Sequence, residues 1–158
     1  MGTHYAGTSG QIEALNTYIK LIRSADTIIS RVYSGSHMKG ITVSQFGVLE
    51  TIYHLGPMHQ REIGTKILKS SGNITMVVDN LERRGLVERH RDRPDRRYVS
   101  VHLTPAGKEL VERIFPEHVR LIEQELSVLT SAEKEQLGHL CKQLGLSNEK
   151  SVSNQAAD

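Results

Sequence analysis

Arginine is concentrated in one short stretch of this 158-residue chain. Residues 83–97 contain seven arginines and only three acids, so their local charge is +4, whereas the formal net charge of the whole chain is +2. A guanidinium is always charged, and its planar fork matches phosphate oxygens and guanine edges. The stretch is therefore suited to bind a polyanion, and duplex DNA is the leading candidate. The seven are Arg83, Arg84, Arg89, Arg91, Arg93, Arg96 and Arg97.

An amphipathic helix is expected directly before this stretch, from about residue 72 to residue 84. Its apolar residues share one face. The other face carries side chains that can bond to base edges or touch a thymine methyl group, and two serines stand where helix N–H groups suit a phosphate. The candidate DNA contacts here are Ser70, Ser71, Asn73, Thr75, Met76, Asn80 and Arg83.

Beyond Gly85, which is expected to end the helix in a left-handed conformation, the apolar period changes to two. Residues 86–91 and 98–103 alternate on either side of a turn that contains Pro94. This pattern predicts a β-hairpin with a basic tip. Arg93, Arg96 and Arg97 at the tip are long enough to enter a narrow, A·T-rich minor groove, where the negative potential is highest.

Three helices must precede this segment to position it. The first, from about residue 11 to 33, carries two adjacent apolar stripes, which predicts that a partner subunit covers one side. The second should begin at a capping box formed by Thr42 and Gln45 and stop at Gly56-Pro57. A short third helix from about residue 60 to 68 should lead by a turn into the reading helix.

Two further helices follow the hairpin. Thr104-Pro105 is expected to open a long helix, which Pro116 should kink or interrupt. A capping box at Thr130 should open a last helix that Gly145 closes. The order predicts a mainly α protein with a small β-hairpin. A helix-turn-helix followed by a hairpin is a winged helix, in which the second helix enters the major groove and the hairpin tip reaches an adjacent groove or the backbone.

On these residues the chain resembles the multiple-antibiotic-resistance regulator (MarR) family. The matching stretches are residues 41–49, 70–84, 85–89 and 95–107, and the resemblance spans about residues 11–146. It implies a homodimer with a winged helix at residues 41–104 and a helical dimerisation lobe from residues 11–34 and 105–146. It also implies a repressor that a small phenolic, quinone-like or oxidising effector releases from a pseudo-palindromic operator. Asp95, Arg96 and Arg97 match wing residues, and Asp95 is expected to orient an arginine.

An effector site between the two lobes is also implied by the resemblance. Its apolar, aromatic and hydrogen-bonding candidates are Tyr18, Ile22, Phe46, Tyr53, Phe115 and His118, for each of which core packing is the alternative interpretation. Thiol-based members of the family carry a reactive cysteine near the first helix, which this chain lacks. Its single cysteine, Cys141, is expected to be a small buried hydrophobe, with oxidation across a dimer axis as the alternative.

Other classes of function find little support in the sequence. There is no Gly-rich phosphate loop, nucleophile elbow or metal-spaced histidine pair, so no enzyme, metal or cofactor is expected. The single cysteine and the lack of a long apolar run predict a cytoplasmic protein without a membrane anchor, and residues 1–10 and 147–158 are expected to be flexible ends. The remaining alternative is a winged helix that binds an acidic protein partner, because an arginine patch does not select the kind of polyanion.

Overall fold

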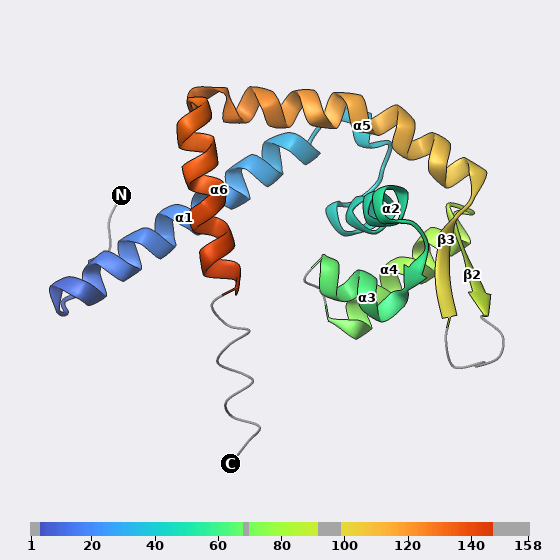
Figure 1. The fold of residues 1–158 in the computed structure, drawn as a ribbon, viewed down its shortest axis with the longest axis horizontal. Helices are drawn as coiled ribbons and strands as arrows, with labels where there is room; N and C mark the ends of the chain where they lie inside the picture. The colour runs from blue at the N-terminus through green and yellow to red at the C-terminus, as the bar shows by residue number, and fades with distance from the viewer. Residues whose placement is uncertain (1–3, 68–69, 92–98, 147–158) are drawn as a thin grey trace, which may run out of the picture. The chain divides into compact units, whose positions relative to one another are not determined.

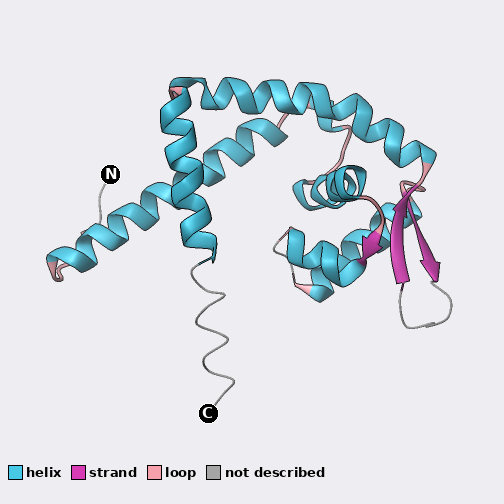
Figure 2. Cartoon of the chain, viewed as in Figure 1, coloured by secondary structure: helices cyan, strands magenta, loops and turns pink. Residues whose placement is uncertain are grey.

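The computed structural model describes residues 4–67, 70–91 and 99–146. The chain divides into two compact units, Met1–Arg120 and Leu121–Asp158, and helices dominate both (Figures 1 and 2). The elements are α1 (Ser9–Tyr33), η1 (Ser36–Met38), α2 (Val43–Leu55), β1 (Met58–His59), α3 (Gln60–Lys66), α4 (Ser71–Arg83), β2 (Val87–Arg91), β3 (Val99–Leu103), α5 (Pro105–Glu125), η2 (Leu126–Val128) and α6 (Ser131–Leu146). The mainly α architecture with a small β component is confirmed.

The helix starts follow the capping chemistry of the sequence. At α2, Thr42 Oγ1 accepts from the Gln45 N–H at 3.3 Å while Gln45 Oε1 accepts from the Thr42 N–H at 3.0 Å, so the predicted capping box is confirmed. The predicted box before α6 is confirmed too, between Thr130 and Glu133. An unpredicted third box, at Thr8, starts α1 at Ser9, two residues earlier than expected.

A three-stranded antiparallel sheet replaces the expected two-stranded hairpin. The predicted pair is present, with Val87 opposite Leu103 and Arg91 opposite Val99. The additional strand β1 pairs with β3 through Met58 and His59, which gives the order β1-β3-β2. A strand of two residues has no visible alternation, so the sequence pattern could not reveal it.

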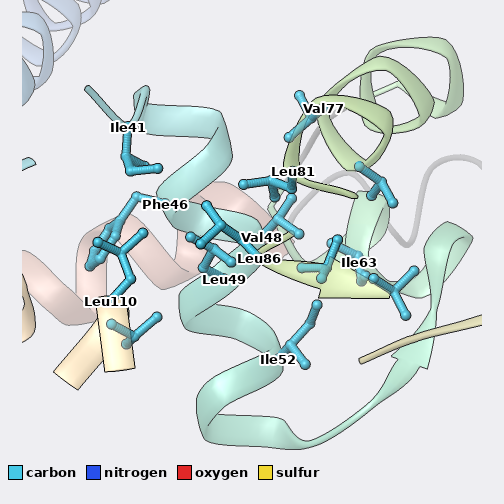
Figure 3. Close-up of a cluster of buried hydrophobic side chains, with 14 of the residues drawn as sticks. Ile41, Phe46, Val48, Leu49, Ile52, Ile63, Val77, Leu81, Leu86 and Leu110 are labelled. Carbon is cyan, nitrogen blue, oxygen red and sulfur yellow. The ribbon is translucent and has the colours of Figure 1, made fainter. Parts of the chain in front are cut away.

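One apolar core holds the helices and the sheet of the first unit together (Figure 3). The four residues that were expected to share one face of α4 are all buried, and they pack with residues of α2, α3, the sheet and α5. The reading helix is therefore fixed along its back, and its opposite face is left for a partner. The four α4 residues are Ile74, Val77, Val78 and Leu81.

The end of α4 is set by Gly85, whose φ of 67° lies in the left-handed region, as predicted. The Gly85 N–H donates to the Glu82 carbonyl at 2.9 Å, and the Leu86 N–H donates to the Leu81 carbonyl at 3.0 Å. This is the Schellman pattern of helix termination. It turns the chain directly from the reading helix into β2.

Two predicted helix breaks do not occur. Pro116 lies inside α5, and the helix is not interrupted there. A proline removes one backbone donor, and the burial of Ile114 and His118 on either side of it offsets this loss. Gly145 is helical in α6, whose last described residue is Leu146, so the prediction that Gly145 closes this helix is wrong. A glycine permits a left-handed stop but does not impose one. In the described part of the chain, no helix has the length and apolar character needed to cross a membrane.

Candidate nucleic-acid interface

The exposed face of α4 carries the side chains that the sequence assigned to base reading. Asn73, Thr75 and Arg83 are exposed, Asn80 is half-buried, and Met76 is 59% exposed although it is a large apolar residue. An exposed apolar side chain among polar ones suits a surface that meets a thymine methyl group. The structure thus brings these five predicted residues together on one helix face.

Ser70 occupies the N-cap position of α4, with an extended backbone at φ −64° and ψ 153°. Its hydroxyl makes no capping hydrogen bond, and its side chain is exposed. This arrangement suits a phosphate oxygen at the helix start, as predicted for this end of the helix. Ser71 is the first residue of α4.

Two of the predicted reading residues are bonded to each other. The Arg83 guanidinium donates through Nη2 to Asn80 Oδ1 and through Nε to the Asp79 carbonyl at 3.4 Å. The Asn80 amide oxygen therefore already accepts one hydrogen bond in the free protein. A bidentate bond from Asn80 to adenine would share this oxygen with Arg83 or displace Arg83 from it.

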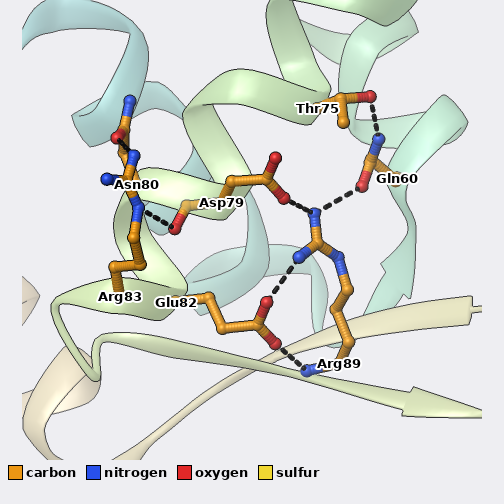
Figure 4. A network of polar contacts seen from close by, with 7 residues as sticks. All are labelled: Gln60, Thr75, Asp79, Asn80, Glu82, Arg83 and Arg89. Carbon is orange, nitrogen blue, oxygen red and sulfur yellow. Dashed lines mark hydrogen bonds and ion pairs between the residues drawn. The ribbon is translucent and has the colours of Figure 1, made fainter.

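Arg89 does not face outward as a phosphate ligand. Its guanidinium donates to Asp79 Oδ1 at 2.5 Å, to Gln60 Oε1 at 3.2 Å and to Glu82 Oε2, and its backbone N–H donates to Glu82 Oε1 at 3.2 Å (Figure 4). Its side chain is only 23% exposed. Arg89 thus neutralises two carboxylates of α4 that would otherwise repel a phosphate backbone, and it ties β2 to the reading helix.

The Arg84 guanidinium also bonds to another part of the protein. Its Nη1 donates to the Gly40 carbonyl at 3.1 Å and to Gln45 Oε1 at 3.5 Å, which joins the end of α4 to the start of α2. Of the four arginines of the basic stretch that the structure describes, Arg83, Arg84 and Arg91 are exposed and Arg89 is half-buried. The idea that the whole stretch delivers guanidinium groups to a polyanion is therefore corrected, because Arg84 and Arg89 organise the fold. The predicted tip residues Arg93, Asp95, Arg96 and Arg97 lie outside the described residues.

The sequence patterns did not lead to the roles of Gln60 and Arg89. A signal for Arg89 exists, because it lies two residues after the buried Val87, on the same face of the strand, and opposite the fully buried Val101. The period-two pattern therefore places Arg89 on the inner face of the hairpin. Gln60 carried no comparable signal, since its contacts come from elements that are distant in sequence.

The predicted effector residues fall into three groups. Phe46 and His118 are buried and in ring contact, with centroids 4.7 Å apart, and Tyr33 lies 5.0 Å from His118. A second set centres on His54, whose ring lies 5.1 Å from Tyr53 and 4.9 Å from Phe115. Tyr18 and Ile22 are exposed on α1, at 61% and 41%.

Tyr53 also lines an open surface depression. Its volume is about 420 Å³, and it lies between the end of α2, β3 and the first turn of α5. The Tyr53 hydroxyl donates to Glu112 Oε1 at 3.4 Å close by. The lining residues are Ile52, Tyr53, Pro57, His102, Leu103 and Lys108, so only one predicted effector residue takes part in it.

His118 is a buried titratable group, only 3% exposed, and its Nδ1 has no hydrogen-bond partner among the described residues. Burial lowers the pKa of His118 below its ordinary value of 6.5, and the charge of His37 lowers this pKa further. The imidazole is therefore neutral in the folded protein near neutral pH, and protonating it carries a free-energy cost that the unfolded chain avoids.

The stability of the fold should consequently fall in mild acid. The unfolded chain binds a proton at His118 as pH drops through about 6.5, whereas the folded chain resists until its lower pKa is reached. Chemical unfolding at a series of pH values from about 8 to 5 should show this loss, and His118→Leu should remove part of it. His139→Leu, at an exposed position of α6, is the matched control and should keep the wild-type slope. Identical slopes for all three proteins would contradict the assignment to His118.

Cys141 is exposed on α6, so the expectation that it is a buried hydrophobe is wrong for the single chain. The apolar side chains beside it, Leu137, Leu140 and Leu144, are likewise 42–59% exposed. Within the second unit, therefore, the apolar side of α6 is not buried.

Comparisons with known proteins agree with this geometry. The MarR family model matches residues 41–99. The HTH-type transcriptional regulator MhqR of Bacillus subtilis is 37% identical over 134 residues, which cover 85% of this chain and 92% of that protein. A mutant MarR from Escherichia coli, solved in complex with operator DNA, superposes with a TM-score of 0.77 at 24% identity and covers 84% of this chain and 95% of its own.

A third comparison is with BpsR of Bordetella bronchiseptica, whose structure concerns the regulation of its DNA binding by 6-hydroxynicotinic acid. Its TM-score is 0.75 at 23% identity, and the match covers 82% of this chain and 98% of that chain. At this identity the likeness establishes a shared fold. The helix-turn-helix, the three-stranded sheet and the helices on either side of them are therefore a known architecture.

Proposed function

This chain belongs to the MarR family of helix-turn-helix transcriptional regulators, and we propose on that premise that it is a homodimeric repressor of a pseudo-palindromic operator. The family consists of DNA-binding transcriptional regulators rather than enzymes. In the proposed complex each subunit places α4 in the major groove of one half-site and extends its wing toward the neighbouring groove. The acidic-protein alternative has no support from this membership.

The observation that carries the proposal is the two-sided character of α4. Four of its side chains are locked in the core, and the opposite face displays Asn73, Thr75, Met76, Asn80 and Arg83. Asn and Arg can bond bidentately to adenine and guanine, and Met can contact a thymine methyl group. A rigid helix with such a face is what sequence-specific recognition requires.

Dimerisation is supported by apolar surface on α1 and, separately, on α6. The 25-residue helix α1 has one buried residue, Val32, among its side chains. It exposes Leu15, Tyr18, Leu21, Ile22 and Ile29 at 36–61%, and α6 exposes three leucines. Removing this much apolar surface from water favours association by about 25 cal/mol per Å². A second copy of the chain is the proposed cover, which two half-sites of an operator also require.

A small aromatic effector of the phenolic or quinone class is the proposed signal. The cluster of Tyr33, Phe46 and His118 combines aromatic faces with a buried imidazole nitrogen that has no partner within residues 4–67, 70–91 and 99–146, which suits a ligand with one hydrogen-bonding group. BpsR, which shares the fold, has its DNA binding regulated by 6-hydroxynicotinic acid. For this chain the effector is expected to release the operator.

Footprinting tests this proposed function. Purified protein is applied to the DNA upstream of its own gene, with and without phenols and quinones. We expect a protected, two-fold symmetric site whose protection is lost with at least one of these compounds. Protection that survives every compound would contradict the proposed effector class, and a protected site without two-fold symmetry would contradict the pseudo-palindromic operator.

Two substitutions should separate the contribution of α4 to specificity from the contribution of the wing to overall affinity. Asn73→Ala should mainly relax the sequence preference, because an asparagine on the reading face bonds to base edges. Arg97→Ala should weaken binding to all sequences and lower the slope of log K against log salt by about one, because it removes a phosphate contact. Titrations against operator and scrambled duplexes at several salt concentrations measure both quantities. Uniform weakening by both variants would contradict this division.

A further inference from the structure

Gln60 lies on α3 and Arg89 on β2, so neither belongs to the reading face of α4, yet both are joined to it (Figure 4). Gln60 Nε2 donates to Thr75 Oγ1 at 2.7 Å. Arg89 Nη2 donates to Gln60 Oε1 at 3.2 Å. The three side chains form a continuous hydrogen-bonded series, which we call the Arg89–Gln60–Thr75 chain.

The direction of the hydrogen bonds in the Arg89–Gln60–Thr75 chain follows from the chemistry of Arg89 at its end. A guanidinium has only donors, so the amide oxygen of Gln60 must face Arg89. The amide nitrogen of Gln60 must therefore face Thr75, whose hydroxyl oxygen is fixed as the acceptor. Asp79 Oδ1, at 2.5 Å, and Glu82 bind the same guanidinium and hold it in place. Arg89 on β2 thus fixes the orientation of the Gln60 amide.

The bond from Gln60 determines the χ1 rotamer of Thr75. A threonine in a helix divides between two χ1 rotamers, because its hydroxyl can also turn toward the preceding turn of the helix. A bond of 2.7 Å from Gln60 selects the rotamer that brings Oγ1 to α3, and this choice also sets the direction of the methyl group. A methyl group reads thymine, whereas a hydroxyl can bond to several base edges, so the rotamer affects which base is preferred.

We propose that Gln60 and Arg89 are specificity-determining residues that never touch the bases, and that they set the base preference at one position by fixing the Thr75 side chain. This inference rests on the proposed function, in which α4 reads DNA. Arg89 is a positioning residue that acts through Gln60. Its location on β2 also means that one guanidinium links the strand leading to the wing with a reading residue.

The test measures relative affinities for an operator and for variants with single base-pair changes. Thr75→Ala first identifies the base pair that Thr75 reads, as the pair whose replacement no longer weakens binding. In the wild-type protein that replacement should cost roughly tenfold in affinity, the size typical of one mismatched pair. Gln60→Ala and Arg89→Ala should each reduce the cost at the same pair to less than about threefold and leave the other positions unchanged.

Gln60→Glu is the sharper variant. The carboxylate keeps the length of the side chain and a strong acceptor for Arg89, but its second oxygen can only accept a hydrogen bond. The Thr75 hydroxyl can instead donate to this oxygen, so Oγ1 stays beside α3 and the Thr75 rotamer is kept. Gln60→Glu should therefore retain the discrimination that Gln60→Ala loses. Gln136→Glu, an exposed position on α6, is the control for the added negative charge.

The readout is the ratio of affinities among operators, because a less stable fold or an added charge weakens binding to all of them equally. Thermal unfolding of each variant checks that it is folded at the assay temperature. The proposal is overturned if Gln60→Ala and Arg89→Ala keep the wild-type profile at every base pair, if Gln60→Glu loses the discrimination at the pair that Thr75 reads, or if Thr75→Ala abolishes no discrimination. A wild-type protein that binds no duplex at all would overturn the proposed function itself, which is a distinct outcome.

Discussion

Met76→Glu should lower the affinity for operator DNA by on the order of 100-fold, because like charges brought together in an interface cost several kcal/mol. Met76 is 59% exposed in the middle of the reading face, so a carboxylate there would meet the negative potential of the groove. Glutamate is a good helix former, and α4 should remain folded. Fluorescence anisotropy with a labelled operator measures the loss.

Leu55→Glu is the matched control. Leu55 has the same 59% exposure and also lies on a helix, at the end of α2, but it is not on the reading face. The same change in charge at this position should alter the affinity by less than about threefold, as expected for a charge near the rim of an interface. Equal losses in the two variants would show that net charge, rather than the α4 face, governs binding.

Gly107→Ala should destabilise the protein by about 3 kcal/mol, at the upper end of the usual cost of overpacking. A Cβ at this position would lie 2.0 Å from the Leu86 carbonyl oxygen and 3.0 Å from the Leu86 carbonyl carbon, both backbone atoms. The same carbonyl accepts from the Thr104 N–H at 3.2 Å, and Thr104 Oγ1 donates to the Gly85 carbonyl at 2.6 Å. The start of α5 therefore cannot move away from the turn after α4 without breaking these bonds.

The control for this prediction is Gly138→Ala. Gly138 lies in α6, is exposed, and a Cβ there would meet nothing within 4 Å. Alanine should stabilise this helix by ~0.5–1 kcal/mol relative to glycine. Urea unfolding of both variants measures the difference in free energy. If Gly107→Ala were as stable as the wild-type protein, the close approach of α5 to Leu86 would be contradicted.

Local signals in the sequence were sufficient for most of the fold. The capping boxes at Thr42 and Thr130, the helical period of α4, the left-handed Gly85 and the two-residue period of the hairpin all act over a few residues, and all are present. Features that depend on distant contacts could not be predicted this way. Strand β1 exists only because β3 provides its partner, and Gly145 is helical because a glycine permits a helix stop without imposing one.

In the candidate site, too, features set by local sequence were predictable and features set by distant contacts were not. The exposed face of α4 follows from which residues are apolar, so the reading residues were predictable. A count of arginines could not separate Arg83 from Arg89, since the difference lies in the carboxylates of α4 and the amide of α3 that bind Arg89. Cys141 was placed in a core because its helix has an apolar side, but within one chain that side is exposed.

Selection from a library of random duplexes is the most direct test of the central claim, that two copies of this chain read DNA with paired α4 helices. The wild-type protein should enrich one pseudo-palindromic sequence whose half-sites are separated by about one helical turn, 10–10.5 base pairs from centre to centre. Enrichment of a single unrepeated half-site, or of no sequence over the starting library, would contradict the claim.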